Sequence, residues 1–379
     1  MKRINHNSSA VLIIISIIIA SLMVSSFGCA KKEGEIKIGA ILPLTGDAAK
    51  YGQSAQKGME LAVNEINDRG GIDNKKIRLI IEDSQGQVKD GVATFRKLIS
   101  VEKVPIIIGE LLSSITLAIA PLANEDKVVI LSPASTAPKI TEAGDYIFRN
   151  VASDIVEGQI MAEYALKKMK LNKIAIMYIN NDYGEGLRNA FKQKFTKLGG
   201  LIIDEQAFDQ ASVDFRAQLI KIKKTNPEAI YLIGYKESGR ILKESKELGI
   251  NVQFLGTVLF EDPEILKVAG NAANGVLYSS RAYNPESGDS VVKTFVNSYK
   301  NRYKEVPDIF AGLSYDAINI ATLAIKNGGY ASDGIKKSLY KIQNFPGVTG
   351  NTSFDSNGDA IQPAAIKKIE NGRFIWVEY

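Results

Sequence analysis

Two hydroxyl-bearing residues each follow an apolar run at the place where chemistry is expected in a parallel sheet. Ser113 comes after Ile106–Ile108, and Thr136 comes after Val128–Leu131. Ligands of open α/β sheets bind beyond the carboxyl ends of the strands. If each hydroxyl lies at the start of a helix, the two could hold a carboxylate together with unpaired backbone N–H groups. The alternative is that both are ordinary helix N-caps.

Three tyrosines follow other predicted strands. Tyr51 comes after the run at 36–41, Tyr183 after 174–178, and Tyr235 after 229–233. Tyrosine rings can wall an apolar pocket while offering polar edges to a ligand. Partly buried packing is the alternative, and the position of an isolated tyrosine does not decide between them.

The inventory of reactive residues argues against an enzyme. His6 is the one histidine and Cys29 the one cysteine, so a chain without its first residues has no Ser-His-Asp triad, Cys-His pair or ordinary zinc site. Gly184-Glu185-Gly186 lacks the third glycine of a dinucleotide fingerprint, because Asn189 stands there. We expect no catalytic residue, no metal and no cofactor. Carboxylate pairs such as Glu261-Asp262 leave a glycosidase only as a weak alternative.

The N-terminal segment has the layout of a secretory signal. A basic start precedes an apolar run at 11–20, which is shorter than the roughly 18 to 20 residues that span a bilayer. Cys29 at the end of this segment looks like the acylated cysteine of a bacterial lipoprotein. We therefore predict a lipoprotein signal peptide at 1–28 and an acylated tether at 29–35. The protein would be anchored at the periplasmic or cell surface. A plain secretory signal is the alternative.

The remaining chain alternates strands with amphipathic helices in two successive runs. The predicted strands are 36–41, 77–81, 106–108 and 128–131, then 174–178, 201–208, 229–233, 254–256 and 276–279, and finally 364–369 and 374–379. Helical patterns fill the intervals and the stretch 290–339. Such alternation predicts α/β architecture with two doubly wound parallel-sheet lobes. The net charge of +5 is dispersed, which does not favour nucleic acid as a partner.

Several motifs, in order and spacing, resemble the branched-chain amino-acid group of periplasmic solute-binding proteins, the leucine/isoleucine/valine-binding family of ABC importers. The motifs are Gly39-Ala40-Ile41-Leu42-Pro43-Leu44-Thr45-Gly46, Tyr51-Gly52, Ala62-Val63-Asn64-Glu65-Ile66-Asn67, Ser113-Ser114, Ser132-Pro133-Ala134-Ser135-Thr136-Ala137-Pro138 and Asp182-Tyr183-Gly184-Glu185-Gly186.

The resemblance implies the type I periplasmic-binding-protein fold, with two Rossmann-like lobes joined by three short crossings and a ligand cleft between them. We accordingly divide the chain into lobe 1 at 36–150 and 283–345 and lobe 2 at 151–282 and 346–379.

The resemblance also implies roles for individual residues. Ser113 would hold the α-carboxylate of the ligand, and Ala134 and Thr136 would hold its ammonium and carboxylate. Tyr51, Tyr183, Tyr235, Leu111 and Leu112 would line the pocket.

One position departs from the family pattern. The family's glutamate, which completes the ammonium site, is replaced by Val258. Glu261, a few residues later, or Asp316 could substitute for it. Each has a plain alternative: Glu261 as a solvent-facing residue and Asp316 as a packing or capping carboxylate. The ligand could equally be an amide, or a carboxylate without an amine.

We therefore expect a monomeric, extracytoplasmic binding protein. It would capture a small solute, in the first place an amino acid, and deliver it to the permease of an ABC importer whose ATPase is a separate subunit. A ligand sensor of the same fold, acting on a signalling partner, is the second hypothesis. An exported hydrolase is the third.

Overall fold

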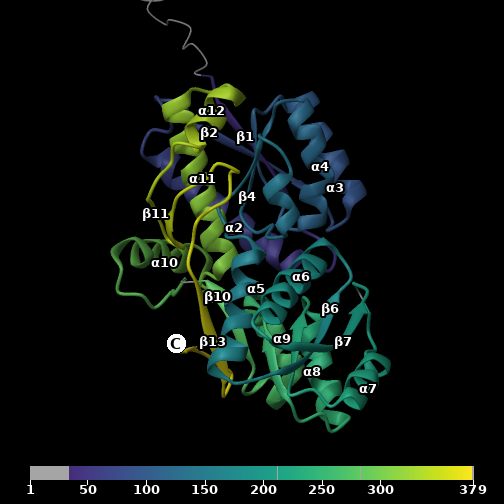
Figure 1. Cartoon of the computed structure of the whole chain (residues 1–379). Helices are drawn as coiled ribbons and strands as arrows, with labels where there is room; N and C mark the ends of the chain where they lie inside the picture. The colour runs from purple at the N-terminus through teal and green to yellow at the C-terminus, as the bar shows by residue number, and fades with distance from the viewer. Residues whose placement is uncertain (1–33, 211, 282, 378–379) are drawn as a thin grey trace, which may run out of the picture.

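The computed structural model describes residues 34–377 apart from 211 and 282, and it has two lobes, one above the other in Figure 1. The upper lobe contains a five-stranded parallel sheet in the order β2-β1-β3-β4-β5. Its strands are β1 (Ile36–Leu42), β2 (Ile77–Asp83), β3 (Ile106–Gly109), β4 (Val129–Ser132) and β5 (Ile147–Arg149).

The lower lobe contains a seven-stranded sheet in the order β14-β13-β10-β9-β8-β6-β7. Five strands are parallel, and the C-terminal hairpin adds β13 and β14 antiparallel at one edge. The strands are β6 (Lys173–Ile179), β7 (Leu201–Phe208), β8 (Ala229–Ile233), β9 (Gln253–Gly256), β10 (Leu277–Arg281), β13 (Ala364–Glu370) and β14 (Arg373–Val377).

Helices cover both faces of the upper sheet, so its strands are buried on both sides. Ile106 and Ile108 of β3 pack in one apolar cluster with α2 (Ala49–Asp68), whereas Ile107 packs in a second cluster with α3 (Val88–Lys97). Successive side chains of a strand point to opposite faces, so a continuous apolar run is what a doubly covered strand requires.

The other helices follow the same arrangement. In the upper lobe they are α4 (Ser113–Glu125), α11 (Ile309–Gly328) and α12 (Ser332–Leu339), with α10 (Ser290–Tyr303) near α2. In the lower lobe they are α5 (Asp154–Glu163), α6 (Asp182–Lys197), α7 (Arg216–Thr225), α8 (Glu237–Glu247) and α9 (Pro263–Ala269). Short π-helical turns, η1 (Leu98–Glu102) and η3 (Tyr164–Lys168), extend α3 and α5, and 3₁₀ turns lie at η2 (Pro138–Glu142), η4 (Val258–Glu261) and η5 (Gly270–Ala273).

The chain passes between the lobes after β5, after β10 and before β13. The last passage comes later than the sequence suggested. The short strands β11 (Phe345–Gly347) and β12 (Gly350–Thr352) are followed by Asp359, which bridges to Arg149 of β5, and Phe354 packs edge-on against Phe148. The segment 346–361 therefore lies on the upper lobe and not, as expected, on the lower one.

The predicted two doubly wound α/β lobes are confirmed. The predicted strands match the observed ones to within a few residues, and β7 and β8 match at both ends. The short strands β5, β11 and β12 were not predicted. Each has three residues, which is too few for an alternating or continuous apolar pattern to be recognised.

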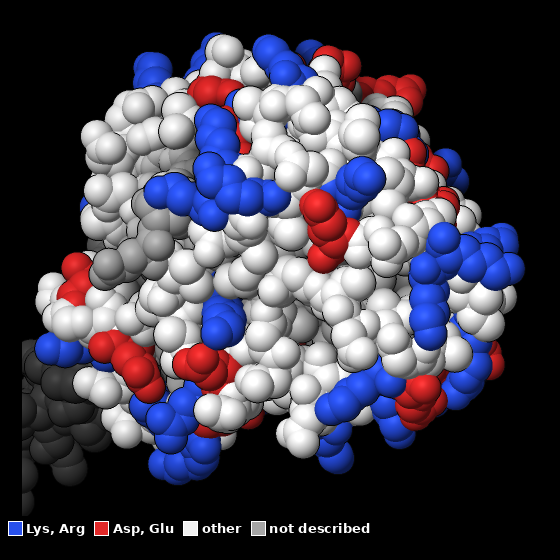
Figure 2. Space-filling model, turned by 60° about the horizontal axis from the view of Figure 1, so that its bottom comes forward, with Lys and Arg blue, Asp and Glu red and all other residues white. Residues whose placement is uncertain are grey.

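Charged side chains are scattered over the surface that Figure 2 shows. Small groups of lysine and arginine are separated there by acidic residues and by uncharged surface. The face shown therefore has no continuous stripe of one sign. Within the part of the chain that the structure describes, no helix is both long enough and apolar enough to cross a membrane.

A buried ion pair ties the last segment of the upper lobe to its sheet. The fully buried Arg149 donates to both carboxyl oxygens of Asp359, each at 2.6 Å, and also to the Ala137 carbonyl oxygen at 2.9 Å. Removal of one partner leaves an uncompensated buried charge. Asp359→Ala should therefore lower the free energy of unfolding by about 3–5 kcal/mol, measured by urea denaturation.

The exposed pair of Lys368 and Glu370 provides the control for this prediction. Glu370→Ala should change the free energy of unfolding by less than about 1 kcal/mol. An equally small effect of Asp359→Ala would contradict the prediction.

Candidate ligand-binding site

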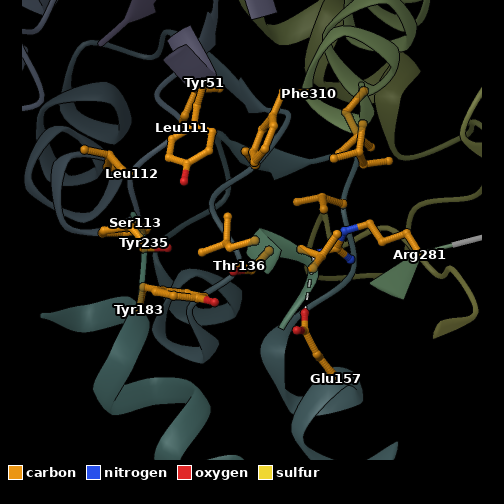
Figure 3. Close-up of a pocket in the computed structure, with 16 residues that line it drawn as sticks. Tyr51, Leu111, Leu112, Ser113, Thr136, Glu157, Tyr183, Tyr235, Arg281 and Phe310 are labelled. Atoms are coloured by element: carbon orange, nitrogen blue, oxygen red, sulfur yellow. Dashed lines mark ion pairs between the residues drawn. The ribbon is translucent and has the colours of Figure 1, made fainter. Parts of the chain in front are cut away.

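A cavity lies between the lobes, at the carboxyl ends of the strands (Figure 3). Eight of the ten predicted ligand residues line it: Tyr51, Leu111, Leu112, Ser113, Ala134, Thr136, Tyr183 and Tyr235. The remaining lining residues are Val151, Glu157, Val258, Leu259, Arg281, Ile309, Phe310 and Leu313. The cavity is therefore mainly apolar, with one hydroxyl-rich side and one charged pair.

The hydroxyl-rich side is built on the start of helix α4. Ser113 is its first residue, and the preceding residue, Leu112, makes no side-chain capping hydrogen bond. The Ser113 Oγ accepts a hydrogen bond from the Ala137 N–H at 3.1 Å, so its own proton is available to a ligand. Thr136 is buried beside it at the cavity wall. Uncapped N–H groups, the partial positive charge of a helix N-terminus and two hydroxyls together suit a carboxylate.

The buried residue Glu110 holds the loops of this side together. Glu110 accepts a hydrogen bond from the Leu112 N–H at 2.6 Å and one from the Ser84 hydroxyl at 2.6 Å. The hydroxyls of Ser132 and Ser135 donate to its backbone carbonyl at 2.6 and 2.8 Å. Burial raises the pKa of Glu110 to about 7. The loops after β3 and β4 are thus fixed relative to each other from within the protein.

Aromatic rings form a wall with contributions from both lobes. Tyr183 and Tyr235 stack with ring centroids 5.6 Å apart and an interplanar angle of 17°. Tyr51 from the upper lobe packs 4.8 Å from the Phe310 ring and 6.4 Å from the Tyr235 ring. The Tyr183 hydroxyl donates to the Thr257 hydroxyl at 3.2 Å. Burial raises the pKa of Tyr183 well above its usual value, so this phenol stays neutral.

A charged pair, which the sequence analysis did not identify, lies on the other side of the cavity. Glu157 of α5 accepts a hydrogen bond from the Ser279 hydroxyl at 2.6 Å, and its second oxygen lies 3.8 Å from an Arg281 guanidinium nitrogen. Both side chains are buried. We predicted that the strand ends at Ser279, whereas β10 continues to Arg281. Arg281 therefore lies at the carboxyl edge of the sheet. A search for polar residues at the end of each strand would have found it, had the end of β10 been predicted correctly.

The two predicted substitutes for the missing acid do not reach the cavity. Glu261 accepts hydrogen bonds from Lys367 at 2.7 Å and from the Ser280 hydroxyl at 2.8 Å. Asp316 accepts from the Val348 and Thr349 N–H groups at 2.8 and 2.9 Å. Both carboxylates hold neighbouring segments in place. The expectation that Glu261 or Asp316 replaces the missing acid is therefore corrected. Asp316 is instead a packing or capping carboxylate, the alternative given for it above.

The lobes touch each other around the cavity. The Asp182 N–H at the start of α6 donates to the Ser114 hydroxyl at 3.4 Å, and Lys139 pairs with the Asp182 carboxylate at 2.9 Å. On another side, Lys236 pairs with Asp47 at 2.5 Å. These contacts join the upper to the lower lobe, so the structure corresponds to a closed arrangement.

The Gly184-Glu185-Gly186 motif has a packing explanation. A Cβ atom on Gly184 would lie 1.9 Å from the Ile179 carbonyl oxygen, and one on Gly186 would lie 2.5 Å from the Pro138 Cδ of the other lobe. The glycines let α6 approach its own strand and the opposite lobe. The motif is therefore explained without a nucleotide.

Three known proteins are similar to this chain over nearly its whole length. The leucine-, isoleucine-, valine-, threonine-, and alanine-binding protein of Pseudomonas aeruginosa is 27% identical over 349 residues, which cover 91% of this chain and 92% of that protein. The structure of LivJ from Streptococcus pneumoniae, a branched-chain amino acid transporter substrate-binding protein in complex with isoleucine, is 30% identical. Its TM-score is 0.83, and the match covers 90% of this chain and 98% of that one.

The third is the solute-binding protein of an ABC transporter from Rhodopseudomonas palustris in complex with 3,4-dihydroxybenzoic acid. It is 26% identical, its TM-score is 0.82, and the match covers 91% of this chain and 96% of that one. A family model described as "Periplasmic binding protein" matches residues 35–373. The chain belongs to this family, as the resemblance of its motifs indicated.

The pKa of Glu110 gives a prediction about stability and pH. The folded protein holds this proton up to about pH 7, whereas the unfolded chain releases it near pH 4.5. The contribution of Glu110 to stability is therefore complete below about pH 4.5 and is lost as the pH rises towards 7. Urea unfolding of Glu110→Gln should show a weaker decrease of stability across this interval than the wild type.

Glu370→Gln, the same substitution at an exposed position, serves as the control for the exchange of a carboxyl group for an amide. Identical slopes for the wild type and Glu110→Gln would contradict the prediction. Burial and the negative charge of Glu157 raise the pKa of Asp154 to about 8. Asp154 should therefore also lower the stability as the pH rises, at a higher pH than Glu110 and equally in both proteins.

Proposed function

We propose that this protein captures a small carboxylate-bearing solute, in the first place an amino acid, outside the cytoplasm and delivers it to the permease of an ABC importer. The observation that carries the proposal is the cavity between the lobes, where eight residues expected from the sequence meet around the uncapped start of α4. The protein would perform no covalent chemistry, and ATP would be used by a separate subunit.

The two-lobed arrangement supports a binding cycle by hinge motion. Ser113 and Thr136 belong to the upper lobe, whereas Tyr183, Tyr235 and Arg281 belong to the lower lobe. A ligand in the cavity touches both groups only when the lobes are closed. It therefore binds the closed state more tightly and shifts the population towards it. The closed state would be the form that the permease distinguishes from the empty protein.

The ligands of the relatives support a carboxylate as the constant feature. Isoleucine, bound by the Streptococcus pneumoniae protein, and 3,4-dihydroxybenzoic acid, bound by the Rhodopseudomonas palustris protein, share a carboxylate but not an ammonium group. In this chain the hydroxyl-rich side of the cavity supplies hydrogen-bond donors for such a group. The opposite side, with Glu157 and Arg281, would decide what else the ligand carries.

Substitution of the two hydroxyls tests the carboxylate site. Hydrogen bonds to a charged group contribute about 1.5–3 kcal/mol each. Ser113→Ala or Thr136→Val should therefore weaken amino-acid binding by roughly 10- to 150-fold in isothermal titration calorimetry, with an almost unchanged melting temperature of the ligand-free protein. Affinities equal to the wild type in both variants would rule out this assignment.

The lipid anchor is a separate proposal, because residues 1–33 lie outside the described residues. It rests on the signal-like segment that ends at Cys29. Cys29→Ser should abolish labelling by a fatty-acid analogue and should release a soluble or uncleaved form. A mature N-terminus at another residue, without lipid, would show that the anchor proposal is wrong and would leave the binding proposal intact.

A further inference from the structure

The Arg281 side chain is more than nine-tenths buried and lines the cavity. Its guanidinium group has five N–H donors. Among the described residues, its ionic partner is Glu157 at 3.8 Å, beyond hydrogen-bond distance, and the guanidinium donates no hydrogen bond to any of them. The guanidinium points into the cavity (Figure 3), so its N–H donors are available there to an acceptor on a ligand.

Two buried carboxyl groups, those of Glu157 and Asp154, interact with the charge of Arg281, and burial together with the charge of Glu157 raises the pKa of Asp154 to about 8, which favours its neutral form. Glu157 already accepts a hydrogen bond from the Ser279 hydroxyl at 2.6 Å, and burial raises the pKa of Glu157, which weakens it as a permanent counter-charge. The other lining residues near this side, Val151, Val258 and Leu259, are apolar. An anionic group entering the cavity would therefore find its strongest partner at Arg281.

Arg281 lies away from the hydroxyl-rich side of the cavity. In Figure 3, Leu112 and Ser113 lie on one side of the cavity, Arg281 and Glu157 on the other, and Thr136 between them. One carboxylate cannot occupy both sides in this arrangement. A ligand that fills the cavity would present one acidic group to Ser113 and Thr136 and a second acceptor to Arg281.

We propose that Arg281 binds a second carboxylate, so that the cavity selects a small dicarboxylic solute, such as an acidic amino acid, over solutes with one carboxylate. A guanidinium matches a carboxylate in a planar, two-point arrangement, which gives both affinity and selectivity. The apolar lining would surround the methylene groups between the two acids. This proposal rests on the proposed function and narrows its ligand.

The test uses calorimetric titration of the mature protein with matched pairs of compounds. Each pair differs in one acidic group: glutamate with glutamine, aspartate with asparagine, and glutarate with pentanoate. Leucine is included as an apolar amino acid. At least one diacid should bind 10-fold or more tightly than its partner, because a lost hydrogen bond to a charged group costs about 10- to 150-fold in affinity.

Arg281→Met should weaken binding of that diacid by roughly 10- to 150-fold and should remove its advantage over its partner. Arg281→Lys, which keeps the charge without the planar fork, should give an intermediate result. Arg373→Met makes the same substitution at an exposed site in β14 and should leave every affinity unchanged. Melting of each ligand-free variant establishes that it is folded.

Two outcomes would overturn the inference, and they are distinguishable. If leucine or another single-carboxylate compound binds as tightly as the best diacid, and Arg281→Met leaves that pattern unchanged, Arg281 does not select the ligand and the proposed function stands. If neither these compounds nor the other amino acids bind at all, the proposed function falls together with the inference.

Discussion

The polarity of the parallel strands is the constraint on which the site depends. In each lobe the parallel strands all end at the same edge, and the next helix or loop begins there. Because both of these edges face the cleft, helix starts, hydroxyls and rings that are far apart in the sequence converge on one small space. Helix α4 supplies N–H groups from the upper lobe, while α6 and β10 supply Tyr183 and Arg281 from the lower lobe. No single loop contains the site.

Buried polar groups in and behind the cavity wall keep this arrangement fixed. Glu110 lies behind the hydroxyl-rich wall. Its carboxyl oxygens bind Leu112 and Ser84, and its carbonyl oxygen binds the loop after β4. Glu157 lines the cavity next to Arg281 and is itself held by the Ser279 hydroxyl. Neither glutamate could perform its role in an exposed loop, because water would compete for its partners. The cavity therefore has a supporting layer of hydrogen bonds beneath the residues that face the ligand.

The sequence was most informative where function follows from local position. Ser113, Thr136 and Tyr183 come directly after apolar runs, so the end of a strand locates them without any knowledge of the tertiary structure. Glu261 shows the limit of this approach. It follows β9 as expected, yet its carboxylate pairs with Lys367, which is 106 residues later in the chain. Arg281 was missed because a serine-containing strand end reads as a loop, although the strand continues through Ser280.

The ion pair between Arg149 and Asp359 links two residues 210 positions apart. Neither lobe is a continuous piece of the chain, and the upper one needs its last strand-like segment from close to the C-terminus. During synthesis, the first 150 residues emerge long before Asp359 does. Long-range contacts of this kind slow folding, because a large loop must close before they form. The upper lobe would thus remain incomplete until almost the whole chain has been synthesised.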